Sequence, residues 1–159
     1  MGDIPRDEIE RDLRQMLASC RTASLATLAP GGAPHAANVQ VVADSQLRLY
    51  WVSSPDSAHS VHLARDPRVA ATVYGPGEDR PDQIHGVQIG GQAVAVEGPA
   101  ERERAWRLYA QKYPFAESPP FREMVDRQRF YRLTPTWLRW IDNRRGFGFS
   151  RELPVAGGS

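Results

Sequence analysis

The side chains with the clearest chemical potential are grouped in residues 53–65, which read SSPDSAHSVHLAR. The apolar run LRLYWV precedes them, and the pattern predicts that a strand ends here and a helix begins near Asp56 or Ser57. The first backbone N–H groups of a helix lack intrahelical acceptors, and the helix dipole adds partial positive charge there. Together with the hydroxyls of Ser53 and Ser57 and the imidazole of His59, they could bind a phosphate without a glycine-rich loop. The competing interpretation is that the serines only cap the helix.

A second candidate in this stretch is a metal site, because His59 and His62 are three residues apart and share one helix face. Only two other histidines occur in the chain, His35 and His85, and neither belongs to a recognisable ligand pattern. We therefore predict no metal site. The sequence also lacks a serine-hydrolase elbow, a Walker A loop, a G-x-G-x-x-G loop after a strand and a C-x-x-C pair, so no residue is assigned a catalytic role.

The composition narrows the classes of partner. The 159 residues carry 20 basic and 19 acidic side chains, and this balance disfavours a protein that coats nucleic acid. Lys112 is the single lysine, so an anion site has to use arginine, histidine, hydroxyl or backbone N–H groups. The chain has one cysteine, Cys20, no apolar leader at its start and no run of about 18 apolar residues. These features lead us to expect a cytoplasmic protein without a membrane span.

The elements that must position the quoted stretch are mostly strands. Alternating apolar residues and β-branched or aromatic residues predict the strands, and helical spacing of apolar residues predicts the helices. The strands are expected at 22–28, 35–43, 47–53, 68–74, 84–98, 129–142 and, as an edge strand, 144–152. The helices are expected at 5–20, 57–65, 99–114 and within 116–128, and residues 153–159 are expected to form a flexible tail.

Two features of this pattern bear on the fold. The first three strands follow one another across tight turns, which predicts an antiparallel meander. Gly90 and Gly91 interrupt the long strand, which indicates a bulge or the close approach of another backbone. Many strands, few helices and no alternation of strands with long helices predict a single domain over residues 1–159, mainly β with α, in which helices pack on a β-barrel.

Residues 24–73, from SLATLAPGG to DPRVAATV, resemble the flavin-binding core of the pyridoxamine 5'-phosphate oxidase-like split β-barrel proteins. The shared order is a strand, a turn with Gly and Pro, two more strands, a helix that opens with serine and a basic residue, and DPRV. Later segments resemble a small branch of the family, so the likeness covers about residues 10–150. It implies a six-stranded antiparallel split β-barrel with peripheral helices, and a homodimer with flavin mononucleotide (FMN) at its interface.

The resemblance also implies roles for individual residues. Ser57, Ala58 and His59 fall where the family binds the phosphate, with His59 in place of the more usual lysine. Ser53 falls where a hydroxyl commonly meets the flavin. The other implied cofactor-binding residues lie on neighbouring strands or near the C-terminal end of the domain, and they are Asn38, Val39, Trp51, Val52, Gln88, Trp140, Asn143 and Arg144.

Two departures separate the chain from the family's oxidases. Ala37 lies near the position of a phosphate-binding arginine, and the longer C-terminal part with substrate-binding Arg and His residues is not found. The chain is therefore not expected to be a true pyridoxamine phosphate oxidase.

Three functional classes remain open. The resemblance favours an FMN-dependent oxidoreductase that acts on a small-molecule substrate, with a nicotinamide as one candidate electron donor. The second class is a carrier or binding protein for a flavin, a deazaflavin or haem, without turnover. The third is a barrel-shaped interaction module that holds no cofactor.

Overall fold

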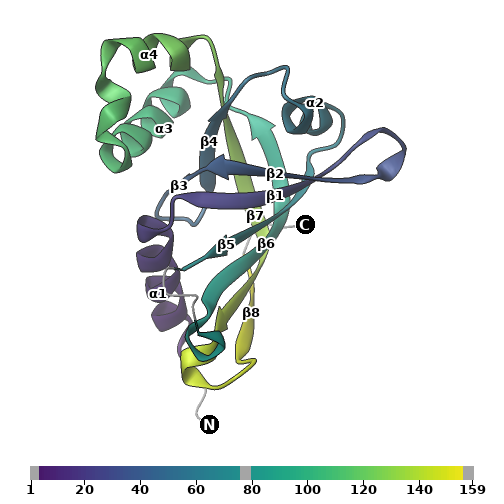
Figure 1. Cartoon of the computed structure of the whole chain (residues 1–159), viewed down its shortest axis with the longest axis vertical. Helices are drawn as coiled ribbons and strands as arrows, with labels where there is room; N and C mark the ends of the chain where they lie inside the picture. The colour runs from purple at the N-terminus through teal and green to yellow at the C-terminus, as the bar shows by residue number, and fades with distance from the viewer. Residues whose placement is uncertain (1–3, 76–79, 156–159) are drawn as a thin grey trace.

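The computed structural model describes residues 4–75 and 80–155. The eight strands of these residues belong to one antiparallel sheet in the order β2-β1-β5-β6-β7-β4-β3, with β8 paired to β7. The sheet curls into a split barrel with helices at its periphery, which confirms the predicted fold (Figure 1). The strands are β1 Thr22–Leu28, β2 Pro34–Gln40, β3 Val42–Ala43, β4 Leu49–Ser53, β5 Arg68–Tyr74, β6 His85–Ala95, β7 Arg129–Asp142 and β8 Ser150–Pro154.

Four α-helices accompany the described strands. They are α1 Arg6–Ser19, α2 Ala58–Arg65, α3 Pro99–Lys112 and α4 Pro119–Asp126. Each lies within two or three residues of its predicted bounds, because apolar spacing and proline or serine starts are local signals. In β1 and β5, exposed and buried residues alternate, so one face of each strand packs inward and the other faces outward.

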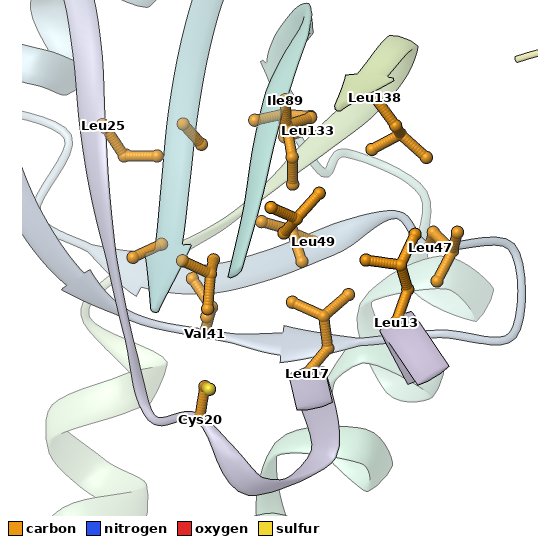
Figure 2. Close-up of a cluster of buried hydrophobic side chains, with 14 of the residues drawn as sticks. Leu13, Leu17, Cys20, Leu25, Val41, Leu47, Leu49, Ile89, Leu133 and Leu138 are labelled. Carbon is orange, nitrogen blue, oxygen red and sulfur yellow. The ribbon is translucent and has the colours of Figure 1, made fainter. Parts of the chain in front are cut away.

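The barrel interior is one cluster of aliphatic side chains. Leu13 and Leu17 of α1 lie against Leu49 and Val41, and Figure 2 shows α1 presenting this stripe to the inward face of the strands. Leu13 and Leu49 are fully buried, and burial of such a side chain contributes roughly 1.5–3 kcal/mol. The apolar stripe predicted for this helix is therefore confirmed as part of the barrel core.

A second cluster lies on the opposite side of β4 and β7. Tyr50 and Phe130 leave those strands on the face away from the barrel interior and pack against α3 and α4. Tyr109 of α3 meets Phe130 edge-to-face, with ring centroids 6.0 Å apart. The two helices thus form a separate aromatic layer beside the barrel (Figure 1).

The predicted meander of the first three strands forms in part. β1 pairs with β2, and β4 pairs on one side with β3, the end of the expected strand 35–43, and on its other side with β7, where Trp51 lies opposite Tyr131. The expected strand 35–43 is also divided, because Val41 separates β2 from β3. The chain therefore crosses from one end of the strand order to the other after β2, and this crossing is the split of the barrel.

The C-terminal segment is more ordered than expected. The predicted tail 153–159 begins inside β8, where Leu153 is buried and pairs with Leu138. The predicted edge strand does form, but only from residue 150 onward. Residues 156–159 of the expected tail lie outside the described residues.

Candidate functional site

The start of α2 holds a compact group of hydroxyls. Ser57 is the residue that precedes the helix, yet its side chain makes no capping hydrogen bond. Its hydroxyl instead donates to the carbonyl oxygen of Ser54 at 2.9 Å and lies 2.8 Å from Oγ of Ser60. The structure therefore does not support the interpretation that the Ser57 side chain caps α2.

His59 joins this group from the first turn of the helix. Its Nε2 lies 2.8 Å from Oγ of Ser53, at the end of β4, and 3.1 Å from Oγ of Ser57. The structure thus brings together the three polar residues that the sequence predicted for a phosphate site. Within the described residues, the backbone N–H groups of Ala58, His59 and Ser60 have no acceptor, so the first turn of α2 offers three further donors.

The electrostatics of His59 suit an anion. Burial lowers the pKa of His59, and the neighbouring imidazoles of His35 and His62 lower it further. No carboxylate is among the groups that perturb this pKa. An anion placed here would be the first negative charge in contact with the imidazole, and it would raise the pKa again.

Sequence reasoning missed three residues on the neighbouring elements. His35 of β2 contacts His62 of α2 edge-to-face, with ring centroids 5.0 Å apart. Nδ1 of His62 lies 3.0 Å from Oγ1 of Thr27 in β1, and both residues are buried. Two sequence patterns could have indicated these residues. Alternation along β2 places His35 on the same inward face as Val39, and the three-residue spacing places His62 on the same helix face as His59.

The outward face of the sheet carries two of the predicted residues in one row. Asn38 of β2, Ser24 of β1, Thr72 of β5 and Gln88 of β6 lie opposite one another in successive strand pairs. The hydroxyl of Ser24 donates to Oδ1 of Asn38 at 2.7 Å. Three of these four side chains also line a shallow cleft of about 470 Å³.

A second row on this face carries almost no side-chain bulk. Ala36, Ala26, Ala70 and Gly90 lie opposite one another across the same four strands. The three alanines are exposed. The face is therefore flat at this level, with the polar row beside it.

Three predicted residues turn their side chains away from any ligand. Trp51 is fully buried and stacks on Tyr131, with ring centroids 5.7 Å apart, and Val39 is buried in the same core. Val52 packs against the second cluster. Nε1 of Trp51 has no acceptor within the described residues. These residues could meet a ligand only through their backbone.

The remaining predicted residues lie at the other end of the barrel from α2 (Figure 1). Nε1 of Trp140 donates to Asp12 at 2.8 Å, and the amide of Asn143 donates to the carbonyl of Pro81 at 2.7 Å. Arg144 pairs with Asp142 at 2.6 Å. Within one chain, the structure does not bring Trp140, Asn143 or Arg144 to the hydroxyl group at α2.

A separate cleft of about 650 Å³ lies on another face of α2. It is lined by Ser60 and Leu63 of α2, by Arg129 and Tyr131 of β7, and by the start of α3. Among the described residues, no group of three metal-ligating side chains is placed to hold a metal ion. No described helix has the length and apolar character needed to cross a membrane.

Comparison with known proteins identifies a family whose sequence model matches the chain. The sequence model of the pyridoxamine 5'-phosphate oxidase family matches residues 9–142. No curated protein sequence matches the chain.

Several solved structures share the fold. The heme binding protein from Mycobacterium smegmatis has a TM-score of 0.78 and 23% identity, over 96% of this chain and 60% of that one. The chain thus spans about three fifths of that protein's length. The conserved hypothetical protein Rv2991 from Mycobacterium tuberculosis has a TM-score of 0.74 and 26% identity, over 90% and 88% of the two chains. An FAD-binding protein from Mesorhizobium loti has a TM-score of 0.62 and 19% identity, over 80% and 90%.

Proposed function

The chain belongs to the pyridoxamine 5'-phosphate oxidase family, and we propose that it binds FMN with the phosphate at the start of α2. The observation that carries the proposal is the convergence of Ser53, Ser57 and His59 with three unpaired backbone N–H groups. All of these groups can donate to a phosphate oxygen, and no acidic side chain perturbs His59. The FAD-binding protein from Mesorhizobium loti, which has the same fold, supports a flavin as the ligand.

The outward face of the sheet suits the flat part of the cofactor. The row of alanines and Gly90 leaves room for a planar ring, and the row with Asn38 and Gln88 offers amide groups to its polar edge. A bound flavin would supply hydride or electron transfer, and the chain would supply orientation and exclusion of water.

Within this proposal, an FMN-dependent oxidoreductase is the first class and a carrier without turnover is the second. Hydride transfer to a flavin does not require a general acid or base, so the lack of an assigned catalytic residue is compatible with the first class. Bleaching of bound flavin by NADH or NADPH, followed by recovery in air, is expected for an oxidoreductase. Flavin that stays oxidised with both nucleotides favours the carrier.

Haem is the second candidate ligand. The heme binding protein from Mycobacterium smegmatis shares the fold, and an imidazole is a common axial ligand of haem iron. A visible spectrum of the purified protein separates the candidates, since oxidised flavin and haem absorb at different wavelengths.

Replacement of Ser57 by alanine is expected to weaken FMN binding by about tenfold, because a hydrogen bond to a charged phosphate contributes about 1.5 kcal/mol. Binding of riboflavin, which lacks the phosphate, is expected to stay unchanged. The two dissociation constants are measured by quenching of flavin fluorescence. Ser57→Ala removes the hydrogen bonds of this hydroxyl to Ser54 and Ser60, so unchanged riboflavin binding also serves to show that the variant is folded.

Ser45→Ala is the matched control, because Ser45 lies exposed in the turn before β4, away from α2. It should leave both constants unchanged. Equal weakening of FMN and riboflavin by Ser57→Ala would contradict the phosphate assignment. A wild-type protein that binds neither FMN nor riboflavin would contradict the proposed function itself.

We also propose that two copies associate through the flat outward face of β2, β1, β5 and β6, with the flavin between them. Two observations support this arrangement: the exposed row of small residues, and Tyr74 beyond the polar row on the same face, which is 58% exposed. Flat faces with exposed apolar residues are typical of association surfaces. The residues at the far end of the barrel, such as Asn143, would then be available to a partner's flavin.

Replacement of Ala26 by arginine is expected to convert the dimer to a monomer, because a long charged side chain would stand in the middle of the flat row. The mass in solution is measured by light scattering or sedimentation. Gln111→Arg, on an exposed position of α3, is the control and should leave the mass of a dimer. A wild-type mass equal to one chain would contradict the shared-site arrangement.

A further inference from the structure

Three of the four histidines of the chain gather between β2 and α2. His59 and His62 are three residues apart and project from neighbouring positions of one helix face. His35 approaches that face from β2, and its ring meets the ring of His62 at an interplanar angle of 85°. His35 and His62 both act electrostatically on His59, so the three imidazoles form one cluster.

The hydrogen bonds divide the cluster into two parts. His62 is buried and is held by Thr27, which makes it a positioning residue for the cluster. His59 faces the hydroxyls of Ser53 and Ser57. His35 is only partly buried, and its ring nitrogens make no hydrogen bond to any described residue. The imidazole of His35 therefore has two nitrogens available to a ligand, beside His62 and within electrostatic reach of His59.

Within the described residues, no carboxylate is paired with these rings or affects the pKa of His59. Asp56 is exposed before α2, and at the end of the helix Asp66 is paired with Arg68 at 2.6 Å. On β7, Arg129 lies opposite Ser53 and lines the cleft on another face of α2. Thr27 of β1 and Ala37 of β2 are uncharged. The charge at the cluster therefore depends mainly on whether the imidazoles are protonated.

We propose that His35 is a second phosphate-binding imidazole, which acts with His59 so that retention of a phosphorylated flavin depends on pH. The inference rests on the proposed function, and adds a ligand-binding residue and a regulation to it. Without a ligand, burial and the neighbouring imidazoles lower the pKa of His59. A phosphate dianion favours protonation of both rings, so binding takes up protons and weakens as the pH rises.

The test compares FMN with riboflavin between about pH 6.5 and about pH 8.5, where imidazoles lose their charge and the phosphate stays mostly dianionic. The dissociation constant of FMN is expected to rise about tenfold or more over this range, while that of riboflavin stays constant. His35→Gln is expected to weaken FMN binding about tenfold at the lower pH and to leave it near the wild-type value at the higher pH. His35→Arg is expected to bind FMN with a flatter pH profile, since arginine keeps its charge.

His85→Gln is the matched control, because His85 is the fourth histidine and contacts the carbonyl of Gln83, away from α2. It should reproduce the wild-type profile. Unchanged riboflavin binding shows that each variant is folded. If FMN binds with the same affinity at every pH, or if His35→Gln behaves as the wild type, the inference is wrong while the proposed function stands. If riboflavin follows the same pH profile as FMN, the phosphate is not the group that the imidazoles bind. If no FMN binds at any pH, both proposals fall.

Discussion

Replacement of Gly91 by alanine is expected to destabilise the barrel by about 3 kcal/mol, because a Cβ atom at this position would overlap the backbone of the facing strand. The added carbon would lie well inside van der Waals contact with the carbonyl oxygen of Thr134 and 3.1 Å from Cα of Pro135. These are backbone atoms, so they cannot rotate away as a side chain would. The ladder between β6 and β7 would have to open at this point.

The close approach has a cause in β7. The register between β6 and β7 shifts between Gly90 and Gly91, so that Gly90 faces Trp137 and Gly91 faces Pro135, with Thr136 as the extra residue. Proline has no N–H for the ladder, and a bulge is one of the few places where a strand accepts it. The glycine allows the bulged backbone to lie directly against β6.

Gly90→Ala is the matched control for this prediction. A Cβ atom at Gly90 would lie 3.5 Å from the ring of Trp137, which is ordinary contact, so the free energy of unfolding should change by no more than about 0.5 kcal/mol. Denaturant unfolding measures both variants, and for Gly91→Ala we expect a lower midpoint with an unchanged slope. In thermal unfolding the same loss corresponds to roughly 6–12 °C. Equal stability of the two variants would mean that the bulge yields without cost.

The bulge shows what a sequence pattern can predict. Two adjacent glycines inside an otherwise apolar strand indicated a bulge or close backbone approach, and the structure contains both. The bounds of β1, β5 and β7 also agree with the expected ranges. Each of these signals is local: alternation, turn residues and glycine or proline act over a few neighbouring positions.

Pairing between distant strands was predicted less well. The predicted meander accounts for the pairs β1–β2 and β3–β4, but not for the pairing of β4 with β7, which lies about eighty residues later in the chain. The apolar pattern of β4 is compatible with either neighbour, because both of its faces are covered. Leu49 and Trp51 face the barrel core, while Tyr50 faces the helices. Local alternation therefore could not decide which strand would lie beside it.

The candidate site likewise has one part that local sequence signals predict and another part that depends on pairing between distant segments. Ser53, Ser57 and His59 lie within seven consecutive positions, and their grouping follows from a strand that ends where a helix begins. His35 of β2 and Thr27 of β1 contact His62 of the same helix, and their approach depends on strand pairings that local sequence patterns do not predict. The predicted residues near the C-terminal end came from resemblance, and the contacts that hold them there are internal to that end of the barrel.

Lys112 is a further residue whose role depends on distant segments. It is the single lysine of the chain and lies in the last turn of α3. Its ammonium donates to the carbonyl oxygens of Leu17 at 2.8 Å, Val41 at 3.0 Å and Cys20. An ammonium has three donors, and here each one has an acceptor. The side chain thus joins α3 to the end of α1 and to the segment between β2 and β3.

Replacement of Lys112 by methionine is expected to destabilise the fold by about 2–4 kcal/mol at neutral pH, because three hydrogen bonds from a charged donor are lost while the aliphatic stem is kept. The carbonyl oxygen of Val41 still accepts a hydrogen bond from the hydroxyl of Tyr113. The free energy of unfolding is measured by denaturant titration. Arg107→Met is the matched control on the same helix, since Arg107 is exposed and paired only with Glu103 at the surface. It removes the same charge and should change the free energy by no more than about 0.5 kcal/mol.

The pH dependence of the free energy of unfolding gives a second way to test the role of Lys112. Burial lowers the pKa of Lys112 to about 8, whereas an unfolded lysine titrates at 10.5. Between these values the unfolded chain binds more protons than the folded one, so this residue makes the stability of the wild type rise with pH in that window. The rise should be absent from Lys112→Met and present in Arg107→Met. A Lys112→Met protein as stable as the wild type at neutral pH would show that the hydrogen bonds of this ammonium do not stabilise the contact between α3 and α1.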